Sequence, residues 1–209
     1  GLKTIGCSLS IDMREPLPKD ERVKRIDLAM DHLYWLDSHF SKTFDGKSIN
    51  MTNVFRRFYK LANQLNDGSA LGFANSRARI RMMMLYQIAQ SNNGLVIGTG
   101  NKVEDFGVGF FTKWGDGGVD ISPIGDLYKS EVYELGASLN ILDSIMTATP
   151  TDGLWDDDRT DVDQLGLTYD QLEEAMKWGT GSQHYDRYVE LRTANLHKMQ
   201  STPVFKNEQ

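Results

Sequence analysis

Three apolar runs along the chain have the length and composition of β-strands. The first, residues 2–11, is rich in β-branched and apolar side chains and predicts a strand buried on both faces of a parallel sheet. Residues 48–54 predict a second strand, and residues 95–97 predict a short buried one. Parallel strands need long connections, so the segments between these runs are expected to be helices.

Helical spacing of apolar residues fills most of the remaining chain. It occurs in residues 20–40, 55–65, 70–90, 129–140 and 172–178, and again from about residue 183. In the first of these segments Val23, Ile26 and Met30 lie three or four positions apart. Thr168 and Gln171 form a capping box that opens the helix over 172–178. The order of elements predicts an α/β fold, with a doubly wound, mostly parallel sheet and helices on both faces.

The composition restricts what this fold can do. With 209 residues, we expect a single domain over 1–209 with a C-terminal helical segment from about residue 165. The net charge of -6 gives no general attraction to nucleic acid or to an anionic membrane, and no apolar run is long enough to cross a bilayer. The only cysteine, Cys7, excludes a disulfide framework and fits a reducing compartment, so a cytoplasmic location is expected. Any phosphate-bearing ligand must therefore be held by local cations.

A glycine-rich segment follows the third predicted strand. It reads GTGNKVEDFGVGFFTKWGDGGVD and carries seven glycines between Gly98 and Gly118, where average usage predicts roughly one or two. Glycines let main-chain amides approach a ligand closely, and a loop at the carboxyl end of a parallel strand is where α/β sheets bind ligands. From glycine content alone, an anion cradle and a set of tight turns are equally good interpretations.

The helix before this segment concentrates cations. In NSRARIRMMMLY, Arg77 and Arg81 are four residues apart, and Arg79 shares a face with Tyr86. An arginine beside an aromatic ring suits a phosphate or carboxylate together with a stacked base. The competing interpretation, favoured by spacing alone, is a solvated basic face with Met82 and its neighbours in the core.

These segments resemble the NAD synthetases. The matching motifs are NSRARIRMMMLY, GTGNKVE, FFTKWGDGGVDISPIGDLYK, ATPTDGLW and NLHKM, in order, over roughly residues 70–200. The resemblance implies the adenine nucleotide alpha hydrolase type of α/β fold. It also implies an ammonia-dependent ligase that activates the nicotinate carboxylate of deamido-NAD with ATP. An acyl adenylate forms, ammonia converts it to the amide, and AMP and pyrophosphate are released.

The resemblance assigns roles residue by residue. For ATP it implies Thr99, Lys129 and Thr151; for deamido-NAD it implies Arg79, Lys113, Asp120, His197 and Lys198, with Tyr86 and Phe111 as weaker stacking candidates. Glu104 is implied as the Mg²⁺ ligand with Asp105 as a competitor, and Lys129 and Lys113 as stabilisers of developing negative charge. Without the resemblance, Lys129 and Glu104 would be read as solvated side chains, and His197 and Lys198 as cations at a helix C-terminus.

Two departures from the family pattern limit the resemblance. One is an extra residue between Glu104 and Lys113 relative to many members, which makes Asp105 compete with Glu104 for the metal. The other is larger. NAD synthetases carry an SGGxDS loop after their first strand, and no such loop occurs here. We therefore expect the N-terminal strand, loop and helix to be missing, which leaves an inactive nucleotide-binding relic, or the synthetase part of a glutamine-dependent enzyme, as alternatives. Residues 155–163 are acidic and predict a mobile lid or a solvated loop. The resemblance also implies a homodimer with residues 80–88 at its interface.

Overall fold

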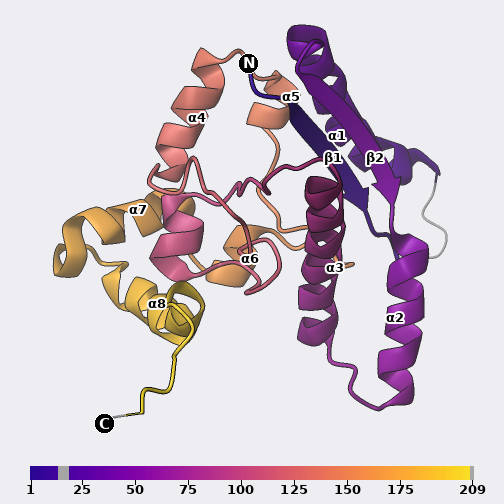
Figure 1. Ribbon diagram of the computed structural model, residues 1–209. Helices are drawn as coiled ribbons and strands as arrows, with labels where there is room; N and C mark the ends of the chain where they lie inside the picture. The colour runs from indigo at the N-terminus through magenta and orange to yellow at the C-terminus, as the bar shows by residue number, and fades with distance from the viewer. Residues whose placement is uncertain (14–18, 208–209) are drawn as a thin grey trace.

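A β–α–β unit opens the computed structural model, which describes residues 1–13 and 19–207, with only the backbone over 19–27. Strand β1 (Thr4–Ser10) pairs in parallel with β2 (Phe44–Asn50), and helix α1 (Lys19–Phe40) connects them (Figure 1). The predicted first helix is confirmed, although the Val23 and Ile26 side chains lie outside the described part. Gly6 is required in β1 because a Cβ there would lie 2.6 Å from the ring of Phe44.

The strands depart from their predicted positions. β1 is half-buried rather than buried on both faces. The second strand ends at Asn50 and not at residue 54, because the Asn50 side chain accepts a hydrogen bond from Thr52 N at 2.9 Å and α2 starts there. The predicted buried strand at 95–97 is wrong in extent. It is a single parallel bridge between Ile97 and Ile121. Of residues 95–97, only Val96 is buried.

Helices make up most of the remaining described chain, and the predicted ones are present. They are α2 (Thr52–Gln64), α3 (Ala70–Ser91), the π-helix η1 (Lys102–Val108), α4 (Lys129–Ser138), α5 (Asp143–Met146), α6 (Asp161–Leu165), α7 (Tyr169–Trp178), the 3₁₀ turn η2 (Gly179–Gly181) and α8 (Tyr185–Met199). The capping box of Thr168 and Gln171 opens α7 as predicted. No helix in the described part of the chain is long and apolar enough to span a bilayer. The result is a helix-rich α/β fold with parallel strands.

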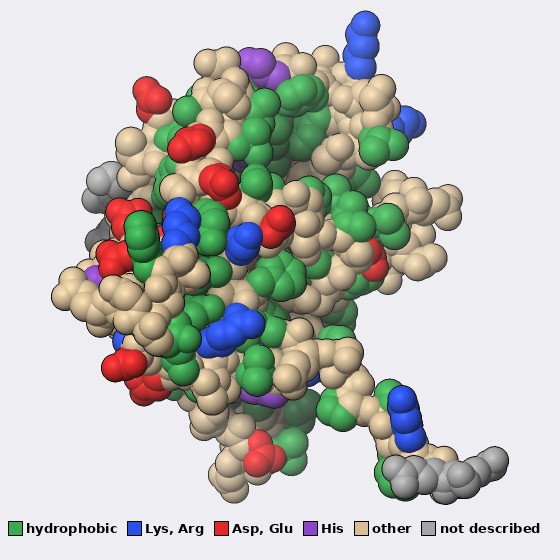
Figure 2. Space-filling model, turned by 90° about the vertical axis from the view of Figure 1, so that its left-hand side faces the viewer, with side chains coloured by type: hydrophobic (Ala, Val, Ile, Leu, Met, Phe, Trp, Pro, Cys, Tyr) green, Lys and Arg blue, Asp and Glu red, His purple; other side chains and the backbone are tan. Residues whose placement is uncertain are grey.

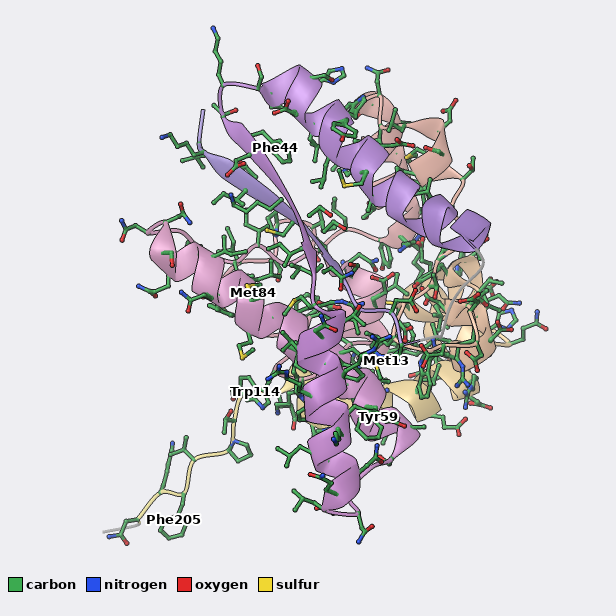
Figure 3. The ribbon with its side chains drawn as sticks, turned by 90° about the vertical axis from the view of Figure 1, so that its right-hand side faces the viewer. Met13, Phe44, Tyr59, Met84, Trp114 and Phe205 are labelled. Carbon is green, nitrogen blue, oxygen red and sulfur yellow. The ribbon has the colours of Figure 1, made fainter. Side chains whose placement is uncertain are left out.

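The buried core nearest the glycine-rich segment lies between η1, α6 and α7. Its fully or nearly fully buried members are Val103, Val108, Leu165, Leu167 and Leu172. Helix α8 packs against η1 and α7 on the outside of this core. Beyond α8 the chain leaves the body as an extended tail in which Phe205 is 92% exposed (Figures 2 and 3). This core therefore fixes the position of the glycine-rich segment.

Leu172 should be one of the side chains that the fold tolerates losing least. It is 0% exposed, so Leu172→Ala should lower the free energy of unfolding by roughly 2–5 kcal/mol through lost burial and a cavity. Leu61→Ala is the matched control, because Leu61 is 57% exposed and its loss should cost less than about 0.5 kcal/mol. Urea denaturation of both variants measures the difference, and equal costs would contradict the assignment of the core.

Candidate functional site

The glycine-rich segment begins with a capped π-helix. Asn101 is 2% exposed, and its side-chain oxygen accepts hydrogen bonds from the backbone N–H groups of Val103 (2.9 Å) and Glu104 (3.1 Å). Gly109, with a φ of 65°, ends the helix in the left-handed region where glycine is favoured. π-Helices are rare and are frequent at functional sites. This one fixes Glu104 and Asp105 in its first turn.

Glu104 is paired with the first residue of α4. Lys129 Nζ lies 2.7 Å from Glu104 Oε1, and the two side chains are only 20% and 17% exposed. The same ammonium lies 4.6 Å from the centroid of the Tyr169 ring. The Tyr169 hydroxyl donates a 2.6 Å hydrogen bond to Asp161 Oδ2. The structure thus brings together Lys129, one of the three predicted ATP residues, and Glu104, the predicted metal ligand. It adds two side chains, Tyr169 and Asp161, that sequence reasoning missed.

Asp105 lies behind this pair, against the backbone of Gly100. A Cβ at Gly100 would be 1.9 Å from Asp105 Oδ2, so only glycine leaves room for this carboxyl. Burial, helped by the charges of Asp116 and Glu104, raises the pKa of Asp105 to about 7. Among the described residues, no group of three or more His, Cys, Asp or Glu side chains gathers as a metal site. The two carboxyls therefore have different environments. Glu104 is paired with the Lys129 ammonium, whereas burial of Asp105 favours its protonated, neutral form.

A second group of predicted residues lies on the outer face of α3. Tyr86 OH donates to Asp120 Oδ1 at 3.1 Å, and Asp120 Oδ2 accepts from Val96 N at 2.8 Å. Arg79 Nε donates to the backbone carbonyl of Lys113 at 3.3 Å. Arg79 and Tyr86, but not Asp120, border a hollow of ≈440 Å³ between α3 and residues 114–119. They are close enough to contact one ligand.

Trp114 forms the opposite wall of this hollow (Figure 3). It is 64% exposed and has a φ of 64°. A bulky residue in the left-handed region is strained, and such strain is concentrated at functional sites. The spacing of residues in the sequence did not indicate this backbone conformation. The signal that could have found it is the position of the tryptophan directly before a glycine in FTKWGDGG.

The two lysines assigned to the dinucleotide donate to backbone carbonyls, one of which is the carbonyl of His197. Lys113 Nζ donates to His197 O at 2.6 Å, and Lys198 Nζ donates to Gly109 O at 3.0 Å and to Phe111 O at 2.9 Å. Burial lowers the pKa of Lys198, partly offset by Asp116. Lys198 also lies 5.7 Å from the centroid of the Phe111 ring. These contacts join α8 to the glycine-rich segment.

The segment that carries Thr151 is tied to α3 by Arg77. Arg77 of α3 donates to Leu154 O and to Asp156 Oδ2, both at 2.7 Å, and lies 5.1 Å from the centroid of the Phe55 ring. Because Arg77 is 6% exposed, the expectation of a solvated basic face is wrong at this position. Thr151 Oγ1 donates to Arg159 O at 3.0 Å, and Thr99 is exposed at the end of the 97–121 bridge.

A known protein family matches most of the chain. The sequence model described as NAD synthase matches residues 39–208. The chain belongs to the NAD synthase family. The match includes Arg79, Glu104 and Lys129 and all of the glycine-rich segment.

Curated relatives in this family are similar over part of their length. The chain is 46% identical over 133 residues to the NH(3)-dependent NAD(+) synthetase of Methanococcoides burtonii, covering 64% of this chain and 50% of the relative. It is 40% identical over 163 residues to that of Archaeoglobus fulgidus, covering 76% of this chain and 64% of the relative. The matched part is thus between half and two thirds of these relatives.

Solved structures overlap nearly the whole chain. A structure of NMN synthetase from Francisella tularensis matches with a TM-score of 0.81 and 30% identity, covering 98% of this chain and 80% of that one. An NH3-dependent NAD synthetase from Campylobacter jejuni matches with a TM-score of 0.67 at 21% identity, covering 97% and 78% of the two chains. The second likeness supports the fold alone.

Loss of Asp156 should release the segment that Arg77 holds. A hydrogen bond to a charged group contributes roughly 1.5 kcal/mol, so Asp156→Ala should speed amide hydrogen exchange over 152–156 about tenfold. Asp157→Ala is the control, because Asp157 pairs with Arg159 and does not reach α3. Exchange measured by mass spectrometry on both variants tests this, and equal rates would show that the Arg77–Asp156 contact does not hold the segment.

The raised pKa of Asp105 predicts a pH-dependent stability. Between the ordinary value of 3.8 and about 7, the folded chain keeps a proton that the unfolded chain loses. The contribution of Asp105 is therefore fully present below 3.8 and is lost as pH rises through about 7. Asparagine does not titrate, so Asp105→Asn does not lose stability in this way. The unfolding free energy of the variant minus that of the natural chain should therefore increase from pH 5 to pH 8. Urea unfolding in EDTA at both pH values measures it, and a constant difference would contradict the shift.

Proposed function

We propose that the chain carries the ligase site of an ammonia-dependent NAD synthetase, which converts deamido-NAD to NAD with ATP and ammonia. The observation that carries this proposal is the Lys129–Glu104 pair, in which Lys129 Nζ lies 2.7 Å from Glu104 Oε1. Glu104 lies in the first turn of the π-helix η1, within the glycine-rich segment. A cation and a carboxylate fixed beside a segment of close-approaching backbone suit a polyphosphate and its counter-ion. Membership of the NAD synthase family supports the same assignment.

The first step needs charge stabilisation more than acid–base chemistry. A nicotinate carboxylate oxygen attacks the α-phosphorus of ATP, the bond from that phosphorus to the bridging oxygen breaks, and pyrophosphate leaves. Both reactants are anionic, so a fixed ammonium that meets the charge developing on the phosphate lowers the barrier. Lys129 supplies this cation, and Thr99 and Thr151 supply hydroxyl groups for hydrogen bonds to ATP.

In the second step, ammonia attacks the carbonyl carbon of the acyl adenylate and AMP leaves. Nitrogen loses a proton as the amide forms. The ammonium ion, which predominates in neutral water, has no lone pair, so the site must favour neutral ammonia as the nucleophile. Burial raises the pKa values of the Asp105 and Asp116 carboxyls in this region, so once ionised they are stronger proton acceptors than ordinary carboxylates.

The donor set fits Mg²⁺ bound through ATP. Mg²⁺ is held by one or two protein carboxylates together with phosphate oxygens and water, so a dedicated cage of side chains is not needed. Glu104 would hold the ion and Asp105 is the second candidate. The ion, when bound, neutralises charge on the phosphates. Lys129 would then exchange its contact with Glu104 for a phosphate oxygen.

The nicotinate nucleotide is assigned to the hollow on α3. Arg79 supplies a cation for a phosphate or carboxylate, and Asp120 accepts hydrogen bonds from hydroxyl groups. Tyr86 and Trp114 supply aromatic faces, with Phe111 close to Lys198. Lys113, His197 and Lys198 complete the predicted set from the junction with α8.

A mononucleotide substrate is the second candidate. The structure with the TM-score of 0.81 is that of an NMN synthetase, and it overlaps 98% of this chain. The same chemistry on a nicotinate mononucleotide would use the same Lys129 and Glu104. The two candidates therefore differ only in what the α3 hollow binds beyond the nicotinate nucleotide itself.

Two further expectations accompany the proposed activity. A homodimer through α3 is supported by side chains left open on its outer face, with Met83 59% and Tyr86 38% exposed beside Trp114. A cytoplasmic location is supported by the single cysteine and by the substrates, which are metabolites of that compartment.

The decisive experiment assays the full-length natural protein for amide formation from each nicotinate nucleotide with ATP, Mg²⁺ and ammonia. Lys129→Met should lower kcat/KM about 100- to 1000-fold. Lys102→Met is the matched control, because Lys102 also forms an ion pair and faces a tyrosine ring, with Asp126 and Tyr128, and it should stay within about threefold.

Each outcome separates the alternatives. Activity on the dinucleotide alone supports NAD synthetase, and preference for the mononucleotide supports the second candidate. ATP binding without product indicates a nucleotide-binding relic. Dependence on glutamine rather than ammonia indicates a glutamine-dependent synthetase. Equal activity of Lys129→Met and the natural protein would remove Lys129 from the chemistry and overturn the proposed site.

A further inference from the structure

Tyr169 is the side chain on which the polar contacts around Lys129 converge. It is the first residue of α7, directly after the capping residue Thr168, so its backbone is fixed by the start of the helix. Its ring faces Lys129 Nζ at 4.6 Å from the centroid, and its hydroxyl donates to Asp161 Oδ2 at 2.6 Å. Burial and the neighbouring Glu104 and Asp161 carboxylates raise the pKa of this hydroxyl, which keeps it a donor.

Asp161 fixes the other end of this contact. It is 6% exposed and is the first residue of α6, opened by the capping box of Thr160. Its backbone N–H donates to Pro150 O at 3.1 Å, the residue before Thr151. A single buried aspartate thus fixes the Tyr169 hydroxyl with its side chain and the start of the Thr151 segment with its backbone.

The arrangement is costly for a purely structural contact. Burying a carboxylate and a phenol disfavours folding unless every polar atom is paired. Asp161 Oδ1 is buried without a hydrogen-bond partner among the described residues. An apolar pair would fill the same space between α6 and α7 at lower cost. The hydroxyl–carboxylate contact is therefore better explained by what it holds in place.

We infer that Tyr169 and Asp161 are positioning residues that hold Lys129 and Glu104 in the geometry used to bind ATP. Lysine has four rotatable side-chain bonds, and fixing them on binding costs conformational entropy. A ring beneath the ammonium and a carboxylate beside it remove most of that freedom beforehand. Asp161 fixes the ring through the hydroxyl, and the elements involved, α4, α6 and α7, converge on η1 (Figure 1). This inference rests on the proposed function, because it takes Lys129 as an ATP contact.

The test compares variants that separate the ring, the hydroxyl and the charge. Tyr169→Phe keeps the ring and removes only the hydroxyl, and Asp161→Leu removes the acceptor. Both should raise KM for ATP and the ATP dissociation constant about tenfold, since small misplacement of a positioned group is costly. KM for the nicotinate nucleotide should change less than about twofold, because the α3 hollow is untouched. Asp161→Asn keeps an acceptor oxygen and should recover most of the loss.

Tyr185→Phe is the matched control. Tyr185 is also the first residue of a helix, α8, and its ring lies 6.2 Å from that of Tyr188, with no lysine over it among the described contacts. Its loss of a hydroxyl should leave both KM values unchanged. The double variant Tyr169→Phe with Asp161→Leu should lose no more ATP affinity than either single variant, because both act through one contact.

Binding and turnover together distinguish the possible failures. ATP binding is measured by calorimetry on the full-length natural protein, without the nicotinate substrate. If the natural protein neither binds ATP nor ligates, the proposed function fails and this inference fails with it. If it binds ATP and Tyr169→Phe binds equally well, the inference alone is overturned. An equal rise in both KM values with a lowered Tm would show a structural role and would also overturn it.

Discussion

Donation from α8 to the carbonyl groups of residues 106–111 is the interaction on which the site depends. A short π-helix followed by glycines leaves its carbonyls without partners inside the helix. Arg192 donates to Phe106 O and Gly107 O, Asn195 to Val108 O, and Lys198 to Gly109 O and Phe111 O. These three residues are three apart on α8, so they form one row facing the segment. Glu104 and Asp105 are held at the other end of the same segment, so the row on α8 determines where the carboxylates lie.

The carbonyl contacts of Lys198 and Lys113 leave both lysines able to take the role in ligand binding that is proposed for them. An ammonium has three N–H donors. Lys198 uses two on carbonyls and Lys113 uses one on His197 O. Each therefore keeps at least one donor for a ligand, and its carbonyl contacts fix the position of that donor. Both lysines thus close α8 onto the glycine-rich segment, and in the proposed function they would couple the packing of α8 to ligand binding.

The sequence predicted elements well where the signal is local. Spacing and caps located α1, α3 and α7, because apolar periodicity and the box of Thr168 and Gln171 act within one helix. Strands were placed less well, since their limits depend on pairing with distant residues. The apolar run at 95–97 predicted burial, yet only Val96 is covered, because Leu95 and Ile97 face the outside.

The same limit applies to the site. The resemblance supplied Lys129 and Glu104, but the residues that fix them are distant in sequence. Asp161 meets Tyr169 across eight residues, and Arg77 reaches Asp156 across 79. No period or motif predicts contacts of this kind, because they depend on where separate loops end in space. Arginine on a polar-looking helix face is usually solvated. Arg77 departs from this because a backbone carbonyl and a carboxylate pair its two terminal nitrogens in the interior, whereas its buried Nε has no partner among the described residues. A buried cation is stable only where partners are brought to it. The segment carrying Thr151 is therefore held by α3, the helix that also lines the ≈440 Å³ hollow. In the proposed function, this one helix would link the ATP and nicotinate parts of the site.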